Sequence, residues 1–135
     1  MKPSENLLLI DTTRERLLVA RVGSDGVEVR TEDTQRRHSE CLNEIVSGLV
    51  PDLRGASAFA VVNAHGSWTG VRVGVVAVKA WSLATGRPII ELPAAESDEE
   101  LFKLARAKYD LGEFTEMHRL EPYYDAEFKV TQKQK

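Results

Sequence analysis

The sequence has a single cysteine, Cys41, and therefore no disulfide can form within the chain. It also lacks an excess of basic residues: the formal net charge is −3, which argues against a general nucleic-acid-binding protein. Long hydrophobic runs are missing as well, because residues 7–10 are too few for a secretory signal and residues 71–78 too few for a membrane span. At 135 residues, the chain is expected to form one cytoplasmic globular domain, or one domain with a tail.

Residues that carry chemistry are also few. The histidines His38, His65 and His118 show no metal-ligand spacing, and the sequence has no C-x-x-C pair and no P-loop lysine motif. His65 could act as a general base or be a loop residue without a catalytic role, and Cys41 could be a nucleophile or a small apolar residue of a helix. The second interpretation is simpler in both cases, so we expect no catalytic residue and no metal site.

The N-terminal part of the chain has the pattern of an antiparallel meander. Residues 7–10 form a continuous apolar run, which is typical of a strand buried on both faces. Residues 17–22 and 27–31 predict two further strands, and the four residues 23–26 between them, Gly-Ser-Asp-Gly, are a strong hairpin signal.

Helices and strands alternate in the next part. Residues 39–49 predict a helix capped by Ser39, and residues 69–85 predict a second helix; strands are expected at 58–62 and 89–92. Helical crossovers make the first, fourth and fifth strands parallel. The expected fold class is therefore α/β, a mixed five-stranded sheet of order 3-2-1-4-5 with helices on its faces, which is the RNase-H-like arrangement.

The segment 63–74 joins the fourth strand to the second helix and contains several small residues. It could cradle a phosphate with backbone N–H groups, or it could be a tight turn that positions a helix capped by Thr69. Asp11 could in the same way be a magnesium-side carboxylate, or could close the turn after the first strand together with Thr12. The weak cofactor-binding candidates are Asp11, Thr12, Gly66, Ser67, Thr69 and Gly70.

The helix expected at 69–85 is apolar around most of its circumference and rich in valine, so it should form only when it is packed on two sides. One side is the sheet, and the other requires a neighbouring helix, another protein, or both. Trp81 could anchor such an interface or lie in the core of the domain. The pattern does not decide which valines point outward. The predicted partner-interface residues are His38, Leu42, Ile45, Val46, Leu49, Val71, Val75 and Val78.

The C-terminal part predicts a helix over 94–112, capped by Ser97, and a short edge strand within 119–130. Residues 131–135 are expected to be disordered. The predicted organisation is a lobe at 1–95, a C-terminal helix and extended segment packed on it at 96–130, and a tail at 131–135.

Three motifs resemble the TsaB (YeaZ) family of tRNA threonylcarbamoyladenosine biosynthesis. Residues 10–13, Ile-Asp-Thr-Thr, resemble its opening I-D-T-S, and residues 38–42, His-Ser-Glu-Cys-Leu, resemble its H-S-E-x-L. Residues 66–74 resemble its G-P-G-S-F-T-G-L-R-I-G, except that the loop before them, Ala64-His65, is altered. Family members are longer and have two lobes of the actin/Hsp70 ATPase type, so the resemblance implies a short form with mainly the N-terminal lobe.

The resemblance implies a non-catalytic subunit that binds and activates a TsaD-type transferase through a bundle of helices. It implies a TsaE-type ATPase as a partner within the complex, tRNA contact only indirectly, a homodimer through much the same surface, and no membrane. No cofactor is required, and ATP or ADP with magnesium is expected only together with a partner. Older naming links the family to glycoproteases, but no nucleophile–base pair supports that activity. The alternative is a nucleotide-binding or regulatory ASKHA-type module that acts as a homodimer.

Overall fold

The computed structural model describes residues 5–34 and 37–123. In chain order its elements are β1 (Asn6–Asp11), β2 (Arg16–Gly23), β3 (Gly26–Asp33), α1 (His38–Leu49), η1 (Leu53–Gly55), β4 (Ala58–Val62), α2 (Trp68–Thr85), β5 (Ile89–Leu92), α3 (Asp98–Leu111) and η2 (Met117–Arg119). All five strands of the predicted sheet are present, with ends that differ by at most two residues.

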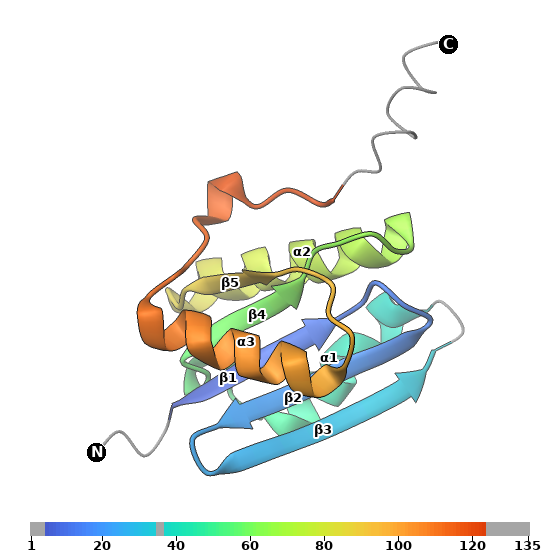
Figure 1. The fold of residues 1–135 in the computed structure, drawn as a ribbon. Helices are drawn as coiled ribbons and strands as arrows, with labels where there is room; N and C mark the ends of the chain where they lie inside the picture. The colour runs from blue at the N-terminus through green and yellow to red at the C-terminus, as the bar shows by residue number, and fades with distance from the viewer. Residues whose placement is uncertain (1–4, 35–36, 124–135) are drawn as a thin grey trace.

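The five strands form one mixed sheet of order β3-β2-β1-β4-β5, which confirms the predicted topology (Figure 1). β1 pairs antiparallel with β2 and parallel with β4, and β4 pairs parallel with β5. The hairpin between β2 and β3 closes on the pair Gly23–Gly26, where Gly26 has a φ of 145° that favours glycine. A tight turn therefore connects the antiparallel strands β2 and β3, and a helical crossover connects the parallel strands β4 and β5.

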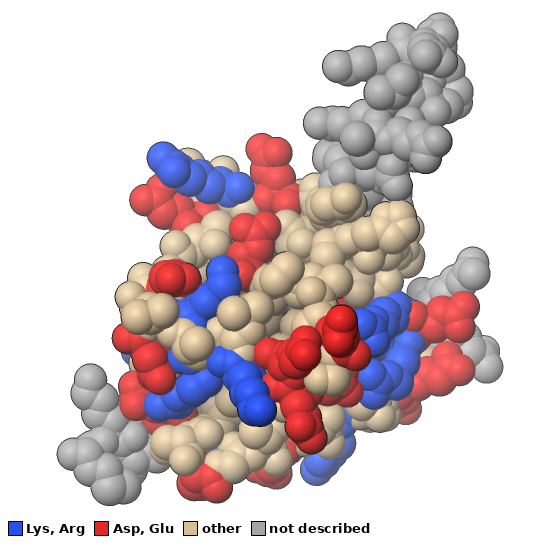
Figure 2. Space-filling model, in the orientation of Figure 1, with Lys and Arg blue, Asp and Glu red and all other residues tan. Residues whose placement is uncertain are grey.

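Helices cover both faces of the sheet, with α1 and α2 behind it and α3 in front in Figure 1. The outer surface on the α3 side carries both acidic and basic residues (Figure 2). Alternate residues of β1 explain why both faces are apolar: Leu8 and Ile10 belong to the core under α1 and α2, and Leu7 and Leu9 to the core under α3. All four are fully buried. A continuous apolar run in the sequence thus marks a strand at the centre of three layers.

Of the N-caps predicted for α1 and α3, the structure contains only the one at α3. Ser97 caps α3 by accepting a hydrogen bond from the Glu100 backbone N–H, as the sequence predicts. α1 differs, because it begins one residue earlier, at His38, and Arg37 occupies its N-cap position without a side-chain hydrogen bond. The prediction that Ser39 caps α1 is therefore wrong, since Ser39 lies inside the first turn.

After α3 the chain runs along the open edge of β5. The Thr115 backbone N–H donates to the Ile89 carbonyl at 2.8 Å, which forms an isolated bridge instead of a strand. Leu120 is then fully buried in the core under α2. The edge strand predicted within 119–130 is not formed at residues 119–123, where η2 ends and the chain continues without regular structure. Residues beyond 123, including the predicted disordered tail at 131–135, lie outside the described residues.

Within residues 5–34 and 37–123, no helix combines the length and the apolar character needed to cross a membrane.

Candidate functional site

The loop that follows β4 ends at Ser67, and Ser67 rather than Thr69 caps α2. The Ser67 hydroxyl accepts a hydrogen bond from the Gly70 backbone N–H at 3.2 Å. The prediction for Thr69 is wrong because the helix begins at Trp68, one residue earlier than expected, so that Thr69 lies in its first turn.

The start of α2 packs directly on the turn between β1 and β2. The Ser67 backbone N–H donates to the Thr13 carbonyl at 3.0 Å, and the Thr12 hydroxyl donates to the Gly70 carbonyl at 2.6 Å. A Cβ atom on Gly66 or Gly70 would lie less than 3.0 Å from the carbonyl oxygen of Thr13 or Thr12. Glycine is therefore required here for close approach of two backbones, which is the second interpretation that the sequence left open.

Gly74 extends this contact by one further turn of α2. A Cβ atom at this position would lie 2.5 Å from the Thr12 hydroxyl oxygen and 3.2 Å from a methyl carbon of Val61. Gly70 and Gly74 are four residues apart and therefore share one face of the helix. The two glycines fix the rotation of α2 about its own axis, because only their face can approach the turn.

Asp11 is buried and its carboxylate closes the turn after β1. Its Oδ1 atom accepts hydrogen bonds from the Thr13 backbone N–H at 2.9 Å and from the Thr13 hydroxyl at 2.6 Å. The Arg14 guanidinium lies 3.9 Å from the other carboxylate oxygen. These contacts agree with the structural interpretation of Asp11 and Thr12, and they account for the burial of a carboxylate.

His38 is buried and joins the start of α1 to the same turn. Its Nε2 lies 2.6 Å from the Arg14 carbonyl oxygen, and its Nδ1 contacts the Thr34 hydroxyl. Because a carbonyl can only accept, Nε2 carries the proton, and a neutral ring then accepts from Thr34 through Nδ1. Both ring nitrogens are occupied, so His38 serves as a structural link and its side chain does not reach a partner surface.

Three of the six cofactor-binding candidates, Ser67, Thr69 and Gly70, line one cavity together with Glu15, whereas Asp11, Thr12 and Gly66 do not line it. The cavity has a volume of ≈ 520 Å³ and opens between the first turns of α1 and α2, and Thr13, Arg14 and Ser39 are also among the residues that line it. Hydroxyl groups and one guanidinium are groups that hydrogen-bond phosphate oxygens. Whether a nucleotide binds there stays a prediction.

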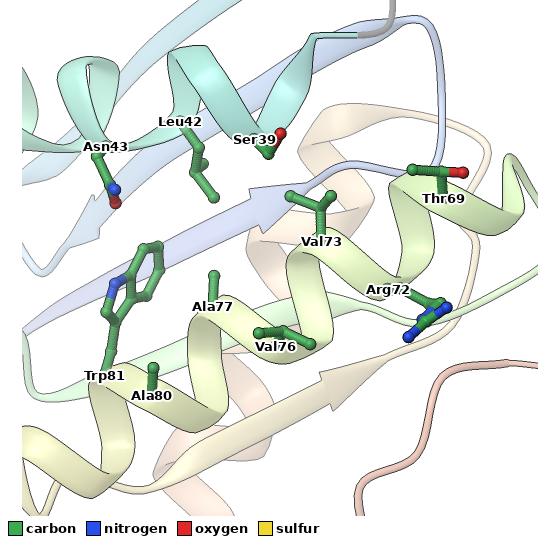
Figure 3. Close-up of a pocket in the computed structure, with 10 residues that line it drawn as sticks. All are labelled: Ser39, Leu42, Asn43, Thr69, Arg72, Val73, Val76, Ala77, Ala80 and Trp81. Atoms are coloured by element: carbon green, nitrogen blue, oxygen red, sulfur yellow. The ribbon is translucent and has the colours of Figure 1, made fainter.

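The second opening is an apolar groove along the exposed side of α1 and α2 (Figure 3). It has a volume of ≈ 450 Å³. Its lining residues are Ser39, Leu42, Asn43, Thr69, Arg72, Val73, Val76, Ala77, Ala80 and Trp81. Figure 3 shows that α2 supplies most of the side chains and that Leu42 and Asn43 face them from α1. Trp81 closes one end, with its ring centroid 5.6 Å from that of Phe59, so it belongs to the core and also lines the groove.

One apolar stripe of α2 lies on the outside of the molecule. We call it the α2 seam, and its residues are Val73, Val76, Ala77, Ala80, Leu83 and Ala84. Their spacing of three and four residues places them on one side of the helix. Val76 is 60% exposed and Leu83 is 75% exposed, although both are large and apolar. No described segment of the chain covers these two side chains.

The structure corrects the predicted partner-interface residues. Val71, Val75 and Val78 are at most 1% exposed because they lie on the same side of α2 as the glycines and face the sheet. The same holds on α1, where Ile45 is half-buried and four others are buried: His38, Leu42, Val46 and Leu49. The four-residue spacing of Gly70 and Gly74 is a sequence signal for one face of α2, but only their contact with Thr12 shows that this face points inward.

At the far end of the groove, a further hollow lies between the ends of α1 and α2 and contains η1. Asp52 caps η1 by accepting a hydrogen bond from the Arg54 backbone N–H at 3.0 Å. That bond, together with a weaker one from the Arg54 side chain, lowers the pKa of Asp52 below its usual value.

Asn63, at the end of β4, holds the C-terminal segment in place. Its Nδ2 donates to the Glu121 carbonyl at 2.7 Å, and its Oδ1 accepts from the Tyr123 backbone N–H at 2.7 Å. Glu91 on β5 orients the same amide through a bond of 2.7 Å. One side-chain amide therefore pairs with the segment as a neighbouring strand would.

Replacing Asn63 by alanine should release residues 113–123 from the β5 edge. Two hydrogen bonds to backbone are lost, so we expect the free energy of unfolding to fall by about 1–3 kcal/mol. Amide hydrogen exchange should accelerate at Thr115 and Tyr123 more than within β1. Glu91→Gln keeps an acceptor for the Asn63 amide and should leave exchange near the wild-type rate. Equal acceleration throughout the sheet would contradict this local role for Asn63.

Comparison with known proteins agrees with this geometry. No family model and no curated protein matches the sequence. Among solved structures, the chain is similar to YeaZ from Pseudomonas aeruginosa, with a TM-score of 0.64 and 26% identity over 80% of this chain and 50% of that one. It is equally similar to an uncharacterized protein with similarity to peptidase YEAZ from the same organism, with a TM-score of 0.64 and 25% identity over 78% of this chain and 48% of that one.

The chain thus spans about half the length of the YeaZ structures that it matches. The matching fold, together with the three sequence motifs and the confirmed strand order, leads to one conclusion. The chain is similar in structure to YeaZ (TsaB), has an RNase-H-like fold, and matches about half of the length of a YeaZ chain.

Proposed function

We propose that the chain is a non-catalytic subunit of the tRNA threonylcarbamoyladenosine machinery that binds a TsaD-type transferase through α1 and α2. The observation that carries the proposal is the exposed α2 seam beside an apolar groove. A TsaE-type ATPase would join through the complex, and tRNA would be contacted only indirectly. We propose that this work takes place in the cytoplasm.

The seam has the properties of a helix-packing surface. It combines large and small side chains: Val76 and Leu83 are exposed, and the small residues Ala77 and Ala80 lie between them along the helix. Helices that pack in this way approach to about 8–10 Å between their axes, and small residues permit the closer distances. An exposed apolar stripe of this kind marks an interaction surface more often than a free surface. The partner best suited to it is another pair of amphipathic helices.

The polar residues near the groove support a role without catalysis. Asp11 is bonded to Thr13, and both ring nitrogens of His38 are occupied by Arg14 and Thr34. A general base needs a free acceptor within reach of a substrate proton. Both His38 nitrogens are already bonded, and the Asp11 oxygen that accepts no hydrogen bond from the described residues, Oδ2, belongs to a side chain that is buried beside Arg14. The proposal therefore assigns chemistry to the transferase.

The test is co-purification of the chain with the TsaD-type transferase of the same organism, followed by size-exclusion chromatography with light scattering. We expect one peak whose mass equals one copy of each protein. Two separate peaks over a range of concentrations would contradict the proposed function, while leaving the fold unaffected.

A second candidate function rests on the polar cavity between the first turns of α1 and α2. Its hydroxyl groups and Arg14 would suit a nucleotide phosphate, as in a nucleotide-binding or regulatory module that acts as a homodimer. A ligand that binds only the folded state raises the midpoint of thermal unfolding. If ADP with magnesium shifts the midpoint of the isolated chain, the second candidate is favoured. A shift only in the presence of the transferase would support the first.

A further inference from the structure

β3 is an edge strand that is open along its whole length. It pairs with β2 on one side, and none of the other described strands pairs with its second side (Figure 1). All of its residues from Gly26 to Asp33 are exposed. α1 packs over β2, and a hollow lies between α1 and residues 30–32 of β3. An open edge of this kind presents free backbone donors and acceptors to another strand.

The hairpin determines which backbone groups of β3 face outward. Because two residues form the turn, Gly23 and Gly26 make a hydrogen-bonded pair, and hydrogen-bonded and non-hydrogen-bonded pairs then alternate along the ladder. Val29 falls in a non-hydrogen-bonded pair with Ala20, so its N–H and C=O point to the open edge. The Arg30 guanidinium donates to the Val29 carbonyl at 3.2 Å, which agrees with that direction.

The side chains of β3 alternate between two faces of the sheet. Val27 and Val29 lie opposite Val22 and Ala20, which belong to the core under α3. The two β3 valines are nevertheless 44% and 37% exposed. Glu28 and Arg30 lie on the α1 side, and the Arg21 guanidinium of the neighbouring strand β2 donates to the Glu28 carboxylate at 2.7 Å.

We propose that β3 pairs with β3 of a second copy of the chain, antiparallel, with Val29 on the two-fold axis. In this register the outward N–H and C=O groups of Val29 bond to those of Val29 in the second copy. Glu28 lies opposite Arg30 of the second copy, and the reverse pair forms on the other side of the axis. Val27 lies opposite Thr31. The strand is therefore complementary to itself in charge and in shape.

Other symmetric registers are less favourable. A two-fold axis at Glu28 or at Arg30 places like charges directly opposite each other, which destabilises a strand pair. An axis at Thr31 pairs Arg30 with Glu32, but it joins only residues 29–33 and places Val29 opposite Asp33. The axis at Val29 joins residues 26–32 and pairs each of the two charges with its opposite. Charge complementarity selects this register.

The test is a charge-swap experiment in a Val76→Glu background, which removes association through the α2 seam. Dimerisation is measured by sedimentation velocity over a concentration series. Arg30→Glu and Glu28→Arg should each weaken self-association by about tenfold or more, because two attractive pairs become repulsive. An equimolar mixture of the two variants should recover the wild-type association, since each then supplies the opposite charge. Recovery also demonstrates that both variants are folded.

Glu32→Arg is the matched control on the same strand. In the proposed register position 32 lies opposite Gly26, so association should stay unchanged. Weakening by Glu32→Arg equal to that by Arg30→Glu would overturn the register. A chain that stays monomeric in the Val76→Glu background, or a mixture that fails to recover association, would overturn the proposal as a whole. This surface is separate from the α2 seam and does not depend on the proposed function.

Discussion

Replacement of Gly70 by alanine should lower the free energy of unfolding by roughly 2–3 kcal/mol, as expected for an added methyl group that has no space. The new Cβ would meet the Thr12 carbonyl oxygen, which is backbone and cannot swing away. Relief of the clash would move the start of α2 from the turn and weaken the Thr12 hydroxyl bond to the Gly70 carbonyl. The midpoint of thermal unfolding should fall by roughly 5–15 °C.

Gly48→Ala is the matched control, because Gly48 also lies in a helix and a Cβ there would meet nothing within 4 Å. Alanine is the better helix former, so this change should raise stability by up to about 1 kcal/mol. Gly70→Ala gains the same helix propensity, so any loss of stability in that variant must come from the clash of the new Cβ with Thr12. Equal stabilisation by both substitutions would show that α2 does not pack closely on the turn.

Val76→Glu should abolish binding to the transferase while leaving the domain folded. Val76 is 60% exposed at the middle of the α2 seam, so a carboxylate there stays hydrated in the free protein. Stability should change by no more than about 0.5 kcal/mol. In the complex the same charge would be buried against an apolar helix and left unpaired, which costs several kcal/mol. Circular dichroism and co-purification measure the two effects separately.

Val75→Glu, one residue away, should have the opposite outcome. Val75 is 1% exposed and faces the sheet, so a carboxylate there loses its hydration in the folded state. We expect destabilisation of about 4 kcal/mol or more, enough to unfold a domain of ordinary stability. A folded Val75→Glu protein that no longer binds, beside a Val76→Glu protein that binds normally, would mean that α2 presents its other face to the partner.

Local signals in the sequence were sufficient for most of the fold. The hairpin at Gly23–Gly26 needs only turn residues between two alternating segments, and the cap at Ser97 needs only a hydroxyl before acidic residues. Two helical crossovers of ordinary hand then give the strand order. The small residues of the motif at 66–74 also predicted a tight segment before the second helix, although its purpose remained open between phosphate binding and positioning of the helix.

The rotation of α2 was decided only by the tertiary structure. A helix that is apolar around most of its circumference carries no hydrophobic face in its sequence pattern, so Val71, Val75 and Val78 were equally good candidates for the outside. The structure resolves this through a contact between residues 58 positions apart, Thr12 and Gly70. That contact turns the valines inward and leaves Val76 exposed on the α2 seam.

The sequence by itself therefore determined the strands of the sheet, their order and the apolar character of most of α2. Periodicity and turn chemistry act over a few residues, and they suffice for those features. Only the tertiary structure decided which side chains form the α2 seam and that Asp11 and His38 are occupied by structural hydrogen bonds. Burial and hydrogen bonding at those positions depend on contacts with segments distant in the chain, and a local sequence pattern cannot predict such contacts.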